Sequence, residues 1–104
     1  MTDTKTTENA LTTEMVDGEA YEYQPMGLYV VRAPAVCRNR PTFKYTRIEI
    51  AGILDRLANG ETIDKIADGL DGYVPRTAIV EAIQIAARMF NSPTADHSEL
   101  VVTR

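Results

Sequence analysis

The sequence predicts a mainly α fold in which three helices follow a short β-rich arm. Apolar residues alternate with polar ones before residue 47 and recur every three to four residues after it, which indicates a change from strands to helices. Glycine and proline divide the second half into three stretches of helical length. The chain has 104 residues, of which 44% are hydrophobic and 25% charged, so its size and composition suit one globular domain.

The arm is expected to begin after a flexible polar tail formed by residues 1–18. This tail holds six threonines and few large apolar side chains, so it could bury too little surface to offset the entropy lost on ordering. Tyr21 and Tyr23 then alternate with polar residues, and residues 28–31 are rich in strand formers. Pro25 and Gly27 mark a turn between these two runs. Another short strand is expected over residues 42–45.

Three helices are expected after the arm, over residues 49–59, 62–69 and 75–90. The first has four apolar residues on one face: Ile50, Ile53, Leu54 and Leu57. Gly60 suits the C-terminal cap of that helix, Thr62 the N-terminal cap of the second, and Pro75 the first position of the third. One domain is therefore expected over residues 19–91, followed by a C-terminal tail over 92–104.

Residues 29–90, about 60% of the chain, carry short motifs in a fixed order. They are Pro34, Cys37, Arg40-Pro41, Thr46-Arg47-Ile48, Gly60-Glu61-Thr62, and an Ala-rich last helix with Ala82 and Ala86. In this order they resemble the family named domain of unknown function 433. The resemblance implies a three-helix, helix-turn-helix-like (homeodomain-like) bundle with a β-rich N-terminal arm. The family usually has glycine where Asn39 and Tyr45 stand, so we expect a remodelled loop before Thr46.

The resemblance also implies two hypotheses for function, because some relatives look like antitoxins that bind DNA and a partner toxin. The first is a dimeric, DNA-binding, antitoxin-like regulator. The second is a protein-interaction module on the same scaffold, which binds a toxin or another protein without DNA. The net charge of −4 and pI of 4.9 argue weakly against DNA, but the acid is concentrated in residues 1–37, with six acidic and two basic side chains.

Two groups of side chains could contact DNA. Residues 38–47 contain four cations and no acid, expected on phosphates: Arg38, Arg40, Lys44 and Arg47. The polar face of the last helix offers side chains that could read bases: Arg76, Thr77, Gln84 and Arg88. Glu81 on that face would repel phosphate. Alternatively, Arg40 and Arg47 hold the arm by bonding loop carbonyls or helix C-termini.

The apolar arc of the last helix spans roughly 200°, which is wide for a solitary bundle. One stripe can pack on the first two helices: Ile79, Ile83, Ala86 and Phe90. The stripe beside it, which includes Ala82, needs the β-arm, the C-terminal segment or another chain. We therefore expect a homodimer whose interface includes Ala78, Ile85 and Met89.

Few residues suit catalysis, so no enzyme, cofactor or metal is expected. The two serines, Ser92 and Ser98, fall with His97 in the expected C-terminal tail, and the glycines form no phosphate-binding loop. His97 with Asp96 and Glu99 could hold a metal, although an exposed polar tail is the favoured interpretation.

The single cysteine, Cys37, excludes an intramolecular disulfide and a cysteine-built zinc site. It could be a reactive thiolate beside Arg38 and Arg40, but a small buried hydrophobe is the favoured interpretation. With no apolar stretch long enough for a membrane span and no signal-like N-terminus, we expect a cytoplasmic protein without a membrane partner.

Overall fold

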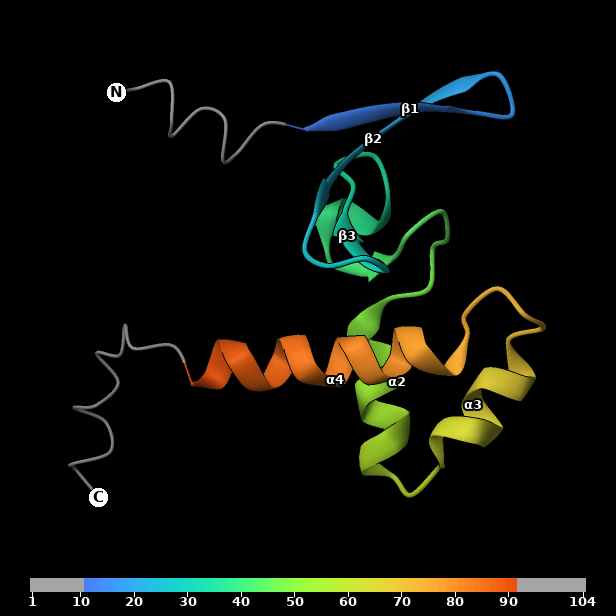
Figure 1. Ribbon diagram of the computed structural model, residues 1–104, viewed down its shortest axis with the longest axis vertical. Helices are drawn as coiled ribbons and strands as arrows, with labels where there is room; N and C mark the ends of the chain where they lie inside the picture. The colour runs from blue at the N-terminus through green and yellow to red at the C-terminus, as the bar shows by residue number, and fades with distance from the viewer. Residues whose placement is uncertain (1–10, 92–104) are drawn as a thin grey trace.

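A computed structural model describes residues 11–91 and places four strands and three α-helices in this part of the chain (Figure 1). In chain order the elements are β1 (Thr12–Val16), β2 (Glu19–Pro25), β3 (Val30–Arg32), the short 3₁₀ turn η1 (Cys37–Asn39), β4 (Thr42–Phe43), α2 (Ile50–Ala58), α3 (Ile63–Gly69) and α4 (Arg76–Phe90). The expected mainly α fold with a short arm is wrong. About 42% of the described residues are helical and 22% are in strands, so the fold is α+β.

The sheet is an antiparallel meander with the strand order β1-β2-β3-β4. Its first hairpin turns at Asp17 and Gly18, which both have positive φ, 52° and 83°, as tight two-residue hairpins favour. This turn is the physical reason for the correction, because it returns the threonine-rich stretch against β2 and makes it a strand. Residues 12–16 of the expected tail thus form β1 and residues 17–18 the hairpin turn, while residues 1–10 and the expected tail over 92–104 lie outside the described residues.

The three helices and their caps agree closely with expectation. Gly60 follows α2 with a φ of 101°, and the Thr62 hydroxyl accepts the backbone N–H of Lys65 at 3.1 Å, which confirms both caps. Pro75 stands one position earlier than expected, as the N-cap of α4. No helix among residues 11–91 is long and apolar enough to cross a membrane.

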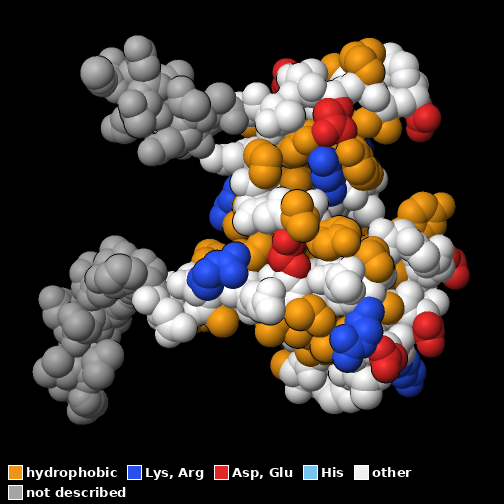
Figure 2. Space-filling view, in the orientation of Figure 1, with side chains coloured by type: hydrophobic (Ala, Val, Ile, Leu, Met, Phe, Trp, Pro, Cys, Tyr) orange, Lys and Arg blue, Asp and Glu red, His pale blue; other side chains and the backbone are white. Residues whose placement is uncertain are grey.

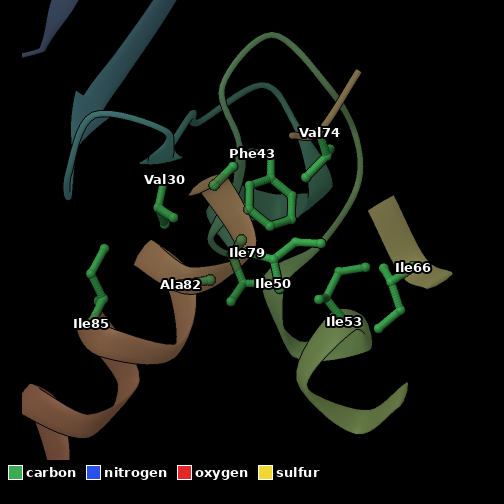
Figure 3. Packing of buried hydrophobic residues seen from close by; sticks show 10 residues of the cluster. Val30, Phe43, Ile50, Ile53, Ile66, Val74, Ile79, Ala82 and Ile85 are labelled. Carbon is green, nitrogen blue, oxygen red and sulfur yellow. The ribbon is translucent and has the colours of Figure 1, made fainter. Parts of the chain in front are cut away.

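The core lies where the lower strands of the sheet meet the helices (Figure 3). Val30 and Phe43, paired across β3 and β4, point toward Ile50 of α2 and Ile79 of α4. The β1–β2 hairpin lies at the end of the molecule farthest from the helices, and α4 crosses α2 so that its C-terminal end extends past it (Figure 1). The sheet therefore covers one side of α4, and the end of that helix is left without a covering element in this view.

Candidate functional site

The cations of residues 38–47 are mostly engaged within the chain. Arg40 holds Glu49, the N-cap residue of α2, through two hydrogen bonds of 2.8 and 2.9 Å. These bonds lower the pKa of Glu49 and raise that of Arg40. Arg38 and Arg47 are exposed, and neither takes part in an ion pair among the described residues. Arg40 thus ties the loop to the start of α2 through a side-chain carboxylate, whereas the alternative interpretation expected a loop carbonyl or a helix C-terminus.

Lys44 is enclosed by a cluster on the β1–β2 hairpin. Its Nζ lies 3.3 Å from the Glu14 carboxylate and 4.7 and 5.0 Å from the ring centroids of Tyr23 and Tyr45. The hydroxyls of Tyr23 and Tyr45 donate to the same carboxylate, the latter at 2.6 Å. These two hydroxyls, and then Lys44, lower the pKa of Glu14, while Tyr23, Tyr45 and Glu14 raise the pKa of Lys44. Lys44 therefore stays protonated and is paired with the Glu14 carboxylate.

Tyr45 keeps the backbone conformation that glycine favours. Its φ is 69° and that of Asn39 is 64°, so the expected remodelling of the loop before Thr46 does not remove the positive φ. The Tyr45 N–H donates to the hydroxyl of Tyr21 at 2.9 Å, and the two rings lie 5.4 Å apart. Contacts with the hairpin thus hold a bulky residue in a strained position.

The turn before Arg40 has an unusual backbone. Cys37, Arg38 and Asn39 have φ of 48°, 57° and 64°, all in the left-handed region. Cys37 is partly buried, and its Sγ donates to the backbone carbonyl of Arg47 at 3.5 Å. This contact joins the loops that carry Arg38 and Arg47. Cys37 is therefore less buried than the favoured interpretation expected.

Two of the four polar residues expected to read bases have partners within the chain. Arg76 pairs with Asp64 at 2.9 Å, and the Thr77 hydroxyl donates to that of Tyr29 at 3.3 Å. Gln84 and Arg88 are exposed. On the face shown in Figure 2, Lys and Arg side chains lie apart from one another, and several have an acidic side chain beside them. The structure shows no gathering of the eight expected nucleic-acid residues on that face.

Glu81 has a structural partner that the sequence did not reveal. Its carboxylate accepts the backbone N–H groups of Leu28 and Tyr29 at 2.7 Å and of Val30 at 3.1 Å. Leu28 and Tyr29 lie in the turn between β2 and β3 and Val30 begins β3, so all three donors are more than fifty residues away along the chain. Glu81 therefore fastens α4 to the sheet, because its carboxylate is held by hydrogen bonds from backbone N–H groups.

An apolar groove of about 170 Å³ lies where the same turn meets α2 and α4. Its walls are almost wholly hydrophobic and include Met26, Ile50, Leu54, Ala82, Ala86 and Met89. A second hollow, of about 300 Å³, lies beside β4 and the start of α4, and its walls are more polar, with Lys44 and three tyrosines: Tyr29, Tyr45 and Tyr73. The first is the stronger candidate for binding a protein, because its apolar wall continues onto an exposed helix end.

The exposed apolar surface of α4 lies at its C-terminal end. Phe90 is 88% exposed and Met89 57%. Ala78 and Ile85, by contrast, are 1% and 7% exposed, because the sheet covers that stripe within one chain. The expected dimer interface is therefore corrected: Ala78 and Ile85 offer almost no surface to a second chain, and only Met89 of the three does.

No group of three or more metal-binding side chains occurs among residues 11–91. Asp96, His97 and Glu99, considered as metal ligands, and Ser92 and Ser98 lie outside the described residues. The structure therefore does not test the alternative of a metal at His97.

These features define a small α+β protein with an apolar groove at the junction of sheet and helices. The chain belongs to the family described as Protein of unknown function (DUF433), whose model matches residues 30–85. This match confirms the family resemblance, and it runs from β3 into α4, leaving out the β1–β2 hairpin and the last turn of α4. Searches of curated proteins and of solved structures found no match.

Proposed function

We propose that this protein is a protein-interaction module, whose groove between the β2–β3 turn, α2 and α4 takes a large apolar side chain of a partner protein. The observation that carries the proposal is an apolar groove that opens beside an exposed apolar helix end. A cavity of about 150 Å³ can hold a benzene molecule, so a groove of this size suits one aromatic or leucine-sized side chain. A helix-lined apolar groove is a recurrent way of binding proteins.

The electrostatics support this proposal over DNA binding as the main function. Arg40, Lys44 and Arg76, three of the cations expected on DNA, are held in ion pairs. A phosphate would have to compete with a carboxylate that is already in contact with each of them. The groove holds no such competing group. Its walls are apolar, and their removal from water on binding is favourable.

The test is a titration of the full-length protein with toluene, followed by the methyl ¹³C–¹H NMR signals. Toluene should shift the methyl signals of Met26, Leu54 and Met89 saturably and leave those of Val16 and Val36 unchanged, since these two valines do not line the groove. Ala86→Gln should abolish the shifts, because residue 86 lines the groove. Ala87→Gln is the matched control, since Ala87 is exposed on the same helix and does not line the groove. Absence of saturable shifts in the wild type would contradict the proposal.

DNA binding remains a second proposal, favoured by the loop that carries Arg38. Arg38 and Arg47 are exposed, lie outside the ion pairs of the described residues, and sit on loops joined by the Cys37 contact. An antitoxin-like regulator would use them on phosphates and the groove on a partner toxin.

With two cations engaged, the logarithm of affinity should fall with the logarithm of salt concentration at a slope of about −2. Arg38→Ala should remove about half of this slope. Arg56→Ala, which breaks an internal pair with Glu61, should leave it unchanged.

A further inference from the structure

We infer that the side chain that enters the groove is Phe90 of a second copy of this chain, so that two copies dock through the C-terminal ends of their α4 helices. The inference rests on the proposed function, since it names the partner of the same groove. It starts from one juxtaposition. Met89 forms part of the groove wall, and the next residue, Phe90, is the most exposed large hydrophobic side chain among the described residues.

Each copy thus carries both halves of a contact at one end of one helix. Phe90 is adjacent to its own groove in sequence but is 88% exposed, so no part of residues 11–91 buries it. In a two-fold dimer the same patch faces itself, and residue i of one copy meets residue j of the other. A two-fold axis near the end of α4 would therefore place each Phe90 at the groove of the partner subunit, and both grooves would be filled at once.

The described elements, which cover residues 11–91, leave this end of α4 uncovered. The C-terminal end of α4 extends past α2 and lies away from the β1–β2 hairpin (Figure 1). The exposed apolar surface also includes Ile83, which lies about two helical turns before Met89 and Phe90 and is 36% exposed. A partner helix could therefore lie along this end without displacing an element of the fold.

One acidic and one basic side chain lie close in sequence to residues of the groove wall. Asp55 follows Ala51 of the groove wall by one turn of α2, and Arg88 precedes Met89 on α4. Both side chains are exposed, and neither is in an ion pair among the described residues. Two copies that meet at this end bring one acid and one base from each side. Asp55 of each copy can then face Arg88 of the partner subunit, which gives two pairs of opposite charge. A partner that placed a like charge at either position would be repelled.

The area available sets the strength of the contact. A fully buried aromatic side chain removes roughly 150–250 Å² from water, and two copies of Phe90 supply this twice. Two buried copies of Phe90 account for about 300–500 Å², below the roughly 1,000 Å² of a stable interface, so the contact belongs to the weak, transient class. We therefore expect a reversible dimer with a dissociation constant in the micromolar range.

Sedimentation equilibrium of the full-length protein, from about 10 to about 300 µM, tests the inference. The wild type should pass from monomer to dimer over this range. Phe90→Glu should raise the dissociation constant by at least about tenfold, because it places a charge in an apolar groove. The matched control is Tyr73→Glu, since Tyr73 is also a highly exposed aromatic residue but lies before α4, away from the groove. Phe90 and Tyr73 are both exposed, so neither change is expected to disturb folding, which circular dichroism checks.

Charge reversal tests the arrangement of the two copies. Asp55→Arg and Arg88→Asp should each weaken the dimer, because each creates like-charged neighbours across the axis. The double variant restores opposite charges and should recover most of the wild-type dissociation constant. A double variant no tighter than either single one overturns the two-fold pairing.

The outcomes separate this inference from the proposed function. Toluene binding by a wild type that stays monomeric at 300 µM overturns the second copy as the occupant and leaves the proposed function standing. A monomer that also fails to bind toluene overturns both. A dimer that Phe90→Glu does not weaken places the contact on another surface.

Discussion

Gly27 and Glu81 are fitted to each other across the junction of sheet and helix. A Cβ atom at residue 27 would lie 2.6 Å from Cδ of Glu81 and within 2.8 Å of both its carboxylate oxygens. The missing side chain is what lets the carboxylate reach the three backbone N–H groups that follow Gly27. One glycine and one glutamate thereby set how α4 docks on the sheet, and with it one wall of the apolar groove.

Removing the Glu81 carboxylate should destabilise the fold. Glu81→Ala removes three charge-assisted hydrogen bonds, and water can replace them only where the turn is exposed. We expect the free energy of unfolding to fall by about 1–3 kcal/mol, measured by urea denaturation. Gln84→Ala on the exposed side of the same helix is the control and should change it by less than about 0.5 kcal/mol. Equal effects from the two changes would mean that the bonds to the turn do not stabilise the fold.

Gly27→Ala should act through Glu81 and not independently of it. The added methyl group would displace the carboxylate, because the nearest atoms are the end of a flexible side chain. Its cost should therefore approach that of Glu81→Ala, about 1–3 kcal/mol. The double variant should be no less stable than Glu81→Ala alone, a non-additivity that a double-mutant cycle measures. Costs that simply add would contradict the fit between the two residues.

Tyr45 should show the cost of its positive φ when its side chain is removed. Tyr45→Ala and Tyr45→Gly lose the same ring contacts and the same bond to Glu14, but only glycine relieves the backbone. The glycine variant should thus be more stable than the alanine variant by about 1 kcal/mol. At Tyr73, whose φ is not positive, the order should reverse, because glycine gains more entropy on unfolding. Thermal or urea denaturation of the four variants gives both comparisons.

The cluster around Glu14 predicts a loss of stability in acid. The hydroxyls of Tyr23 and Tyr45, and then Lys44, hold the pKa of Glu14 below its ordinary value of 4.5. A group whose pKa is lower in the folded state stabilises the fold above the unfolded pKa and loses this effect as the pH falls through the folded pKa. The urea midpoint should therefore fall between about pH 5 and pH 3, and fall less in Glu14→Gln.

Glu19→Gln removes an equal charge from the same hairpin and provides the control for that titration. Glu19 is exposed and accepts no hydrogen bond from the cluster. Its substitution should leave the acid-induced fall as steep as in the wild type. If Glu14→Gln and Glu19→Gln flattened the profile equally, the effect would come from net charge and not from the cluster.

The helices could be predicted from the sequence because their signals are local. The spacing of Ile50, Ile53 and Leu57 marks one face, and Gly60 and Thr62 mark where one helix ends and the next begins. The first strand was missed although its signal was present. Asp17-Gly18 is a strong two-residue hairpin sequence, and it should have outweighed the threonine-rich composition before it.

The rest of the site depends on residues that are far apart in the sequence. Nothing near Glu81 indicates that its partner is a turn more than fifty positions earlier, nor does the run of cations show that Lys44 would meet Glu14 on the first strand. The burial of Ala78 and Ile85 within one chain could not be predicted for the same reason. A wide apolar arc requires cover, but periodicity cannot say whether a strand such as β3 or a second chain provides it for Ile85.

The contact between two copies at the end of α4 can be observed directly by isotope-filtered NMR. In a mixture of ¹³C-labelled and unlabelled protein at high concentration, nuclear Overhauser effects are selected only between different molecules. Cross-peaks should join the Phe90 ring protons of unlabelled molecules to the methyl groups of Ala86, Leu54 and Met26 of labelled ones. If the only intermolecular cross-peaks come from other surfaces, or if none appear while the protein sediments as a dimer, the groove is not where the two chains meet.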